Sequence, residues 1–221
     1  MKAPFILVLH SLEVRRSKYS ISTRSFKTWL EQMLEAGWTG VTLLDALKGC
    51  NKPRLFAVSF DDGYESVYEE AFPVLKAFSI PATIFVPTAF VGGDNSWNHR
   101  ASVRENHLTW RQLRELQENR WEVGHHTHRH YNLLALQDHE IEEEMKEANS
   151  VFAEELPIAP ATFAYPYGKV DQRVAGVIGL FYEYACIAHK IPIPNIVPRL
   201  QLPRYFPGIL PDDVPLINLE T

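Results

Sequence analysis

Short apolar runs alternate along the chain with segments in which apolar residues recur every three or four positions. The runs are rich in β-branched and aromatic residues, as buried strands are. They predict seven strands, over residues 5–9, 40–44, 54–60, 82–86, 121–124, 161–165 and 184–188. Between the strands, helical spacing predicts amphipathic helices with apolar stripes from Phe26 to Leu34, from Val67 to Phe78 and from Ile141 to Phe152.

Two local signals refine the predicted helices. Thr109 and Gln112 have the spacing of a capping box, which predicts a helix start at "TWRQLREL". Pro73 lies within the second stripe and predicts a kink or a new helical turn there, since proline cannot continue the hydrogen bonds of a helix interior.

Strands that alternate with helices predict an α/β fold with a mostly parallel sheet, either closed as a barrel or doubly wound. No internal repeat or linker interrupts the pattern, so residues 1–221 are expected to form a single domain. The C-terminal part differs, because seven prolines fall between Pro192 and Pro215. Prolines exclude a long helix and a central strand, so residues 191–221 are expected to form an extended strap over the domain, or else to be partly disordered.

Composition and charge exclude several classes of partner. The net charge of −5 provides no basic field for nucleic acid or an anionic membrane. The longest apolar run, "PFILVL", is too short to span a bilayer and a poor signal peptide. The chain as given is therefore expected to be cytoplasmic, whereas an incomplete N-terminus would allow an extracellular or periplasmic protein. Cys50 and Cys186 are too few for a disulfide framework.

Chemically capable side chains follow four of the predicted strands. His10 ends the first strand, Asp61 and Asp62 end the third, "HHTHRH" (125–130) follows the fifth, and "YPYG" (165–168) ends the sixth. In such sheets, catalytic and binding residues lie mainly at the carboxyl ends of the strands and in the loops that follow. We therefore expect these groups to converge on one rim.

The histidine run and the aspartate pair together suit a metal ion. His126 and His130 are four positions apart, and neutral imidazoles are good ligands for Zn²⁺ and similar ions. Asp61 or Asp62 could complete a three-ligand face that leaves open positions for water and substrate. The alternatives are a surface histidine cluster with accidental metal affinity and, for "DDG", ordinary turn chemistry.

Three motifs in order, "SFDDG", "EVGHHTHRH" and "FAYPYG", resemble the polysaccharide deacetylase (NodB-homology) family, whose motifs read roughly T-F-D-D-G, H-[ST]-x-x-H and R-x-P-Y-G. The resemblance implies a distorted (β/α) barrel of about seven strands. It also implies that Asp62, His126 and His130 bind a divalent ion, with Zn²⁺ foremost and Co²⁺, Ni²⁺ or Mn²⁺ as alternatives. Asp61 would then be the general base for water that attacks an amide carbonyl, and a backbone N–H near Tyr167 would help to hold the oxyanion.

The chain departs from the family pattern at two places. The late L-x-H motif, whose histidine is the general acid, is absent, but "ILVLH" (6–10) resembles that motif moved to the front, as in a permuted branch of the family. This resemblance implies that His10 is the acid; the alternative is a core histidine that caps the first strand. Ala164 replaces the arginine of the third motif, and Arg204 in "LPRY" could return a guanidinium to the rim or form a surface salt bridge.

Three aromatic residues are further candidates for substrate contact. Trp97, in a glycine-opened loop, could stack on a sugar ring, and Tyr165 and Tyr167 could line the pocket. Ordinary packing would also explain all three.

Three functions remain open on these grounds. The first is a metal-dependent hydrolase that removes N-acetyl, or less often O-acetyl, groups from an acetylated carbohydrate. The second keeps the site but acts on a small amide, imide or ureide, and the third is a non-catalytic carbohydrate-binding descendant. Acetate release from acetylated amino-sugar oligomers separates the first from the others, while the oligomeric state is not determined by the sequence.

Overall fold

The computed structural model describes residues 4–12, 20–48, 54–98, 104–188, 197–207, 210, 214 and 215. The strands are β1 Phe5–Leu9, β2 Ser11–Leu12, β3 Ser20–Ile21, β4 Thr39–Val41, β5 Leu55–Phe60, β6 Thr83–Val86, β7 Glu122–His125, β8 Thr162–Ala164, β9 Tyr184–Ala188 and β10 Leu202–Arg204. The α-helices are α1 Thr23–Glu35, α2 Leu43–Leu47, α3 Phe72–Ala77, α4 Trp110–Glu118, α5 Asp138–Glu155 and α6 Gln172–Ile178. Short helical turns are η1 Val67–Ala71, η2 Thr88–Phe90, η3 Leu133–Ala135 and η4 Pro166–Gly168.

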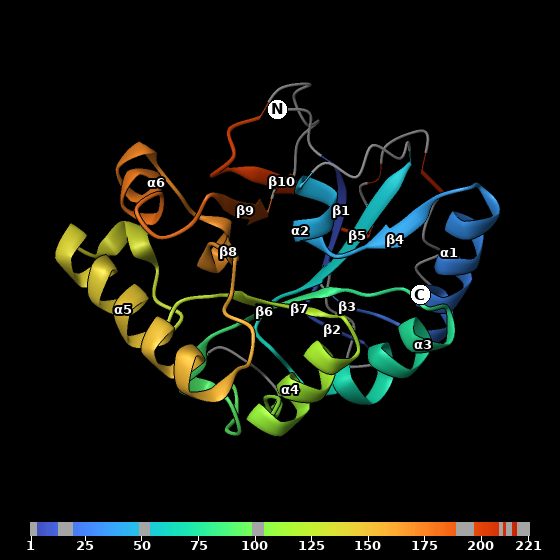
Figure 1. Cartoon of the computed structure of the whole chain (residues 1–221), viewed down its shortest axis with the longest axis horizontal. Helices are drawn as coiled ribbons and strands as arrows, with labels where there is room; N and C mark the ends of the chain where they lie inside the picture. Colours follow the sequence, from blue (N-terminus) through green and yellow to red (C-terminus); the bar gives the residue numbers. More distant parts are fainter. Residues whose placement is uncertain are drawn as a thin grey trace.

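Parallel strands curve into a barrel in the order β1-β5-β6-β7-β8-β9-β10. The ring is brought together between β10 and β1, where Tyr205 donates to the Ile6 carbonyl and accepts from the Val8 amide, both at 2.8 Å. Strand β4 pairs with the first part of β5 and lies outside this ring. Helices surround the curved sheet (Figure 1). The predicted distorted (β/α) barrel of about seven strands is therefore confirmed.

The C-terminal segment differs from the expected strap. Strand β10 contains Pro203 and lies between β9 and β1, so the prediction that prolines exclude a central strand there was wrong. In Figure 1 the red β10 lies beside β9, next to the blue β1. The missing N–H of Pro203 is tolerated because the neighbouring Tyr205 makes both hydrogen bonds to β1. Most of the predicted strap, including residues 191–196, lies outside the described residues.

Local sequence signals explain where several elements begin and end. Thr109 and Gln112 form the predicted capping box at the start of α4. Pro73 lies in the first turn of α3, directly after the π-helical turn η1, as expected for a proline that starts a new turn. The predicted strand over 40–44 is too long, because the Thr42 side chain accepts from the Asp45 amide at 3.2 Å and caps helix α2.

Alternate residues of the strands face two different cores. Leu7 and Leu9 of β1 pack outward in the same cluster as Trp29 of α1, whereas Ile6 faces inward with Ala57 and Phe85. This follows from the twofold repeat of side-chain direction in a strand. Both faces of β1 are buried, which is why its sequence is a continuous apolar run rather than an alternating one.

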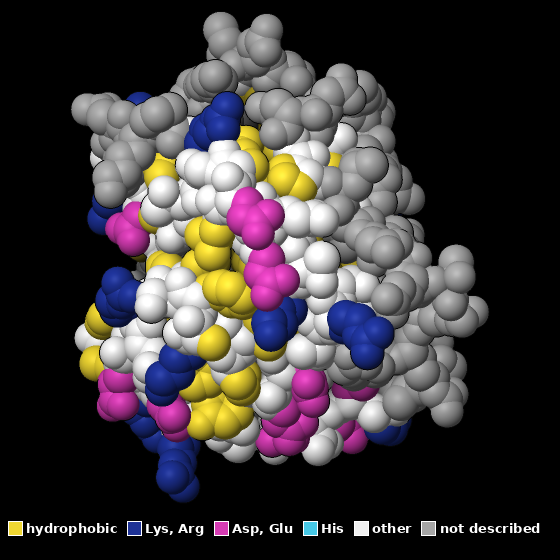
Figure 2. All heavy atoms as spheres, turned by 90° about the vertical axis from the view of Figure 1, so that its right-hand side faces the viewer, with side chains coloured by type: hydrophobic (Ala, Val, Ile, Leu, Met, Phe, Trp, Pro, Cys, Tyr) yellow, Lys and Arg dark blue, Asp and Glu magenta, His cyan; other side chains and the backbone are white. Residues whose placement is uncertain are grey.

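The described surface carries charges of both signs. On the face shown in Figure 2, Lys and Arg side chains are interspersed with Asp and Glu, and no histidine is visible. This mixture fits the modest net charge of −5. None of the described helices is long and apolar enough to cross a membrane.

Gly124 on β7 is expected to be essential for packing inside the barrel. A Cβ at this position would lie 2.5 Å from Cδ1 and Cε1 of Phe85, which real contacts do not reach. Gly124→Ala is therefore expected to lower the free energy of unfolding by about 1–3 kcal/mol, as overpacked cores do. Urea denaturation measures this, with Gly176→Ala as the control, because a Cβ there meets nothing within 4 Å. A Gly124→Ala midpoint equal to the wild-type value would contradict the packing explanation.

Candidate active site

The aspartate pair occupies a sharp turn at the carboxyl end of β5. The strand ends at Phe60, and the Asp61 amide donates to the Leu9 carbonyl at 3.0 Å. Asp62 and Gly63 then adopt left-handed backbone conformations with φ of 68° and 70°. Aspartate tolerates this region better than most residues, and glycine does so without steric cost. The turn allows the two carboxylates to reach different partners.

Asp62, His126 and His130 converge in the structure. Asp62 Oδ1 lies 3.4 Å from His126 Nε2 and 3.1 Å from His130 Nε2. All three side chains are buried, and within the described part of the chain they are the one group of three His, Cys, Asp or Glu residues that could hold a metal ion. The histidines come from the loop after β7, the neighbour of β6 in the sheet.

The spacing of these residues and the tautomer of His126 fit a divalent ion such as Zn²⁺. Ligands bound tetrahedrally at the usual Zn–N and Zn–O lengths lie about 3.4 Å apart. His126 Nδ1 is 2.7 Å from the Ala164 carbonyl oxygen. Since a carbonyl only accepts, Nδ1 must donate, which leaves the Nε2 lone pair directed at Asp62. Two imidazoles and one carboxylate leave coordination positions open for water and substrate.

Burial and charge favour the ligand protonation states. Burial acts to raise the pKa of Asp62, but its interactions with the neighbouring imidazoles of His130 and His126 hold this pKa well below its ordinary value. Burial lowers the pKa of His130 despite the opposing charge of Asp62. A carboxylate and a neutral imidazole are the forms that bind metal.

Asp61 forms a separate, buried ion pair with Arg204. The guanidinium reaches both carboxylate oxygens, with Nη1–Oδ1 at 2.6 Å and Nη2–Oδ2 at 2.7 Å. Arg204 is fully buried, which excludes the alternative of a surface salt bridge. Burial acts to raise the pKa of Asp61, but Arg204, with the charges of His126 and His10, holds it below its ordinary value.

Arg204 is itself held inside the barrel. Its guanidinium lies over the Phe85 ring at 5.3 Å from the centroid, and its Nη1 lies 3.3 Å from Ser59 Oγ. The Phe85 ring in turn covers Gly124. Side chains from β5, β6 and β10 therefore hold the guanidinium that orients Asp61.

His10 lies at the same rim. It directly follows β1, which pairs with β5, and its charge lowers the pKa values of both Asp61 and Asp62. The structure therefore brings together six of the predicted residues: Asp61, Asp62, His10, His126, His130 and Arg204.

The three candidate aromatic residues differ in position. Trp97 and Tyr167 both contact the His130 ring, with ring centroids 4.0 Å and 4.8 Å away. Tyr167 is 56% exposed and has a left-handed backbone with φ of 61°. Tyr165 is fully buried in a hydrophobic cluster with Phe163, which favours the packing alternative for this residue.

The remaining histidines of the run do not join the three-residue group. His125 is fully buried among aromatic rings and accepts from the Thr127 amide at its Nδ1. Burial lowers the pKa of His125 to about 3. His128 Nδ1 is 2.7 Å from Thr88 Oγ1.

Two residues near Asp62 were missed in the sequence. Tyr64 and His107 pair across an isolated β-bridge, and their rings are 5.1 Å apart. Burial raises the pKa of Tyr64, and the charge of Asp62 raises it further. Tyr64 directly follows "DDG" and could have been noticed, whereas no spacing signal distinguishes His107.

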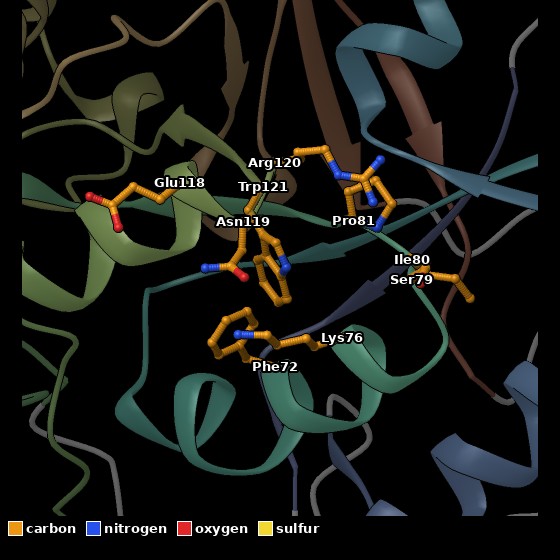
Figure 3. A pocket seen from close by; sticks show the side chains of 9 residues that line it. All are labelled: Phe72, Lys76, Ser79, Ile80, Pro81, Glu118, Asn119, Arg120 and Trp121. Carbon is orange, nitrogen blue, oxygen red and sulfur yellow. The ribbon is translucent and has the colours of Figure 1, made fainter.

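A cavity of about 320 Å³ lies away from this site. It is lined by residues that precede β6 and β7, whereas the candidate site follows the carboxyl ends of the strands. Figure 3 shows the rings of Phe72 and Trp121 at its wall, where they contact each other edge to face. Trp121 also stacks on Phe60 and is 4% exposed, so little of its ring is open to a ligand.

Comparison with known proteins agrees with this geometry. The family described as "Polysaccharide deacetylase" matches residues 48–180, which contain Asp61, Asp62, His126 and His130. A curated relative, the poly-beta-1,6-N-acetyl-D-glucosamine N-deacetylase of Staphylococcus aureus (strain MRSA252), is 28% identical over 202 residues, covering 82% of this chain and 67% of that protein.

Two solved structures have closely similar folds. The structure of IcaB from Ammonifex degensii has a TM-score of 0.79 at 26% identity and covers 96% of this chain and 94% of that chain. The deacetylase PplD of Streptococcus pyogenes, in complex with acetate, has a TM-score of 0.80 at 20% identity and covers 96% of each chain, which shows the fold alone. The family model matches more than half of the residues of this chain, and the chain therefore belongs to the polysaccharide deacetylase family.

Proposed function

We propose that this protein is a metal-dependent hydrolase that removes N-acetyl groups from a polymer of N-acetylglucosamine. The observation that carries the proposal is the convergence of Asp62, His126 and His130 beside a second, independently held carboxylate, Asp61. The name of the Staphylococcus aureus relative supports a β-1,6-linked polymer as the first substrate to test.

Different residues of the chain have different roles in the proposed hydrolysis of the amide. A divalent ion, for which we propose Zn²⁺, would supply Lewis-acid polarisation of the amide carbonyl and would activate water. Asp61 accepts the proton of the attacking water, and its depressed pKa keeps it ionised and ready near neutral pH. Arg204 holds the Asp61 carboxylate through two hydrogen bonds, which fixes the direction of proton transfer.

Three other residues complete the proposed mechanism. His10 donates a proton to the departing amine, a role for which imidazole suits neutral pH. The backbone N–H of Tyr167 shares the negative charge on the carbonyl oxygen. The side chains of Trp97 and Tyr167, which both contact His130, provide apolar surface against which a sugar ring can stack.

Acetate release tests this proposal directly. The protein is expected to release acetate from β-1,6-linked N-acetylglucosamine oligomers, to stop when a chelator removes the metal, and to recover when Zn²⁺ is restored. Soluble amides, cyclic imides and ureides are the comparison substrates. Turnover of these alone would assign the site to a small-molecule hydrolase, and acetate release that persists without metal would refute the proposed mechanism.

A further inference from the structure

The loop that carries His126 and His130 is strained. Thr127 and His130 both have left-handed backbones, with φ of 69° and 56°. Residues with a side chain are strained in this conformation, and a β-branched residue such as threonine is especially unsuited to it. Contacts outside the backbone of the loop must therefore hold its shape.

All five backbone amides of residues 126–130 have acceptors. The His126 amide donates to the Val86 carbonyl of β6 at 3.2 Å. Within the run, the Thr127 amide donates to His125 Nδ1 at 3.0 Å, and the His130 amide donates to Thr127 Oγ1 at 2.8 Å. The two amides between these, of His128 and Arg129, both donate to one distant carboxylate, that of Glu144.

Glu144 reaches the loop from helix α5. Its Oε2 accepts from the His128 amide at 3.1 Å and from the Arg129 amide at 2.7 Å, and its Oε1 accepts from Arg129 Nη1 at 2.6 Å. The Glu144 residue is 3% exposed. A carboxylate is costly to bury unless it is paired, and all three of these partners belong to the loop that contains the metal ligands.

Arg129 strengthens this attachment to α5. Its Nη1 also lies 2.5 Å from Glu147 Oε2, one helical turn after Glu144. Glu147 further approaches His128 Nε2 at 3.7 Å. The middle of the loop is thus fastened to one face of α5, while its two ends carry the imidazoles.

We propose that Glu144 is a positioning residue that sets the affinity of the site for its divalent ion. By accepting from two consecutive amides, it holds the loop in the strained shape that directs both Nε2 atoms at Asp62. This inference rests on the proposed function, because it presupposes that His126 and His130 bind metal. It assigns Glu144 no contact with the ion or the substrate.

Zn²⁺ affinity, measured by competition with a chromophoric chelator, tests the proposal without any assay of activity. Glu144→Ala is expected to weaken Zn²⁺ binding by roughly 10–100-fold, as loss of an outer partner of metal ligands does. Glu144→Gln keeps one acceptor oxygen for the two amides, so its Zn²⁺ affinity is expected to fall less than that of Glu144→Ala. Thermal unfolding of each metal-free protein is recorded alongside the binding measurement.

A matched control separates positioning from general destabilisation. Ala148 is buried on the same helix, and Ala148→Gly is expected to lower the unfolding temperature, because glycine is a poor helix former. Its Zn²⁺ affinity is expected to equal that of the wild type, despite the lower unfolding temperature. This contrast is one that a merely structural role of Glu144 would not produce.

Two failures can be told apart. If the wild type binds Zn²⁺ and Glu144→Ala binds it equally well, the positioning role is refuted and the proposed function stands. If the wild type binds no Zn²⁺, the metal-dependent function fails, and the inference about Glu144 fails with it.

Discussion

Asp61→Asn is expected to lower acetate release by roughly 10²–10⁴-fold, the usual contribution of a positioned general base. Asparagine keeps the size and an acceptor oxygen of the side chain but cannot take a proton from water at neutral pH. Zn²⁺ binding is expected to persist, because the three converging ligand atoms belong to Asp62, His126 and His130. Steady-state acetate release and metal content of the purified variant measure the two effects.

The neighbouring aspartate provides the contrast for this experiment. Asp62→Asn is expected to lose both Zn²⁺ binding and acetate release, since it removes the charged oxygen that lies within 3.4 Å of both imidazole nitrogens. The two adjacent aspartates would then be distinguished, because Asp61→Asn loses acetate release alone, whereas Asp62→Asn loses acetate release and Zn²⁺ binding. Full activity of Asp61→Asn would rule out its role as the base, and loss of metal from that variant would place it among the ligands.

Arg204→Met is expected to lower the free energy of unfolding by about 3–5 kcal/mol, the usual cost of removing one partner from a buried ion pair. Asp61 would remain buried without its bidentate partner. The control is Arg199→Met in the same C-terminal segment, because the ion pair of Arg199 with Glu183 is exposed and is expected to contribute at most about 1 kcal/mol. Equal denaturation midpoints for the two variants would contradict the stabilising effect of the buried Arg204–Asp61 ion pair.

Arg204→Met is also expected to change how the rate of acetate release depends on pH. In the wild type the folded pKa of Asp61 is lowered, so its pairing stabilises the protein above the unfolded pKa, and this contribution is lost as pH falls through the folded pKa. Arg204 lowers the pKa of Asp61, whereas burial raises it. Without Arg204, the pKa of Asp61 is therefore expected to rise. The acidic limb of the pH–rate profile is therefore expected to move to higher pH in Arg204→Met.

Much of the barrel could be predicted from local patterns. The run at residues 5–9 is strand β1 and the run at 184–188 is β9, with the predicted bounds, because buried parallel strands need only a continuous apolar run. The predicted strand over 40–44 was partly wrong, since the capping hydrogen bond of Thr42 converted its second half into helix α2. A single side-chain contact there outweighed the apolar pattern.

The positions of the metal-site candidates were also determined in the sequence. Asp62, His126 and His130 follow two buried strands, and the carboxyl ends of parallel strands share one rim of the barrel, so convergence follows from topology alone. Trp97 and Tyr167 were predicted only as candidates. Their contacts with His130 depend on loop conformations that no periodicity encodes.

By itself the sequence determined most strands of the barrel, the parallel kind of sheet and the groups that could bind a metal, because each of these depends on neighbouring residues or on the order of motifs. Only the tertiary structure decided that Arg204 pairs with Asp61 across 143 positions, that a strand containing proline lies between β9 and β1, and that Glu144 holds the histidine loop. These contacts join segments whose local patterns carry no information about each other. They form because burial in the closed barrel makes an unpaired charge or backbone amide costly, and that cost exists only once the chain has folded around it.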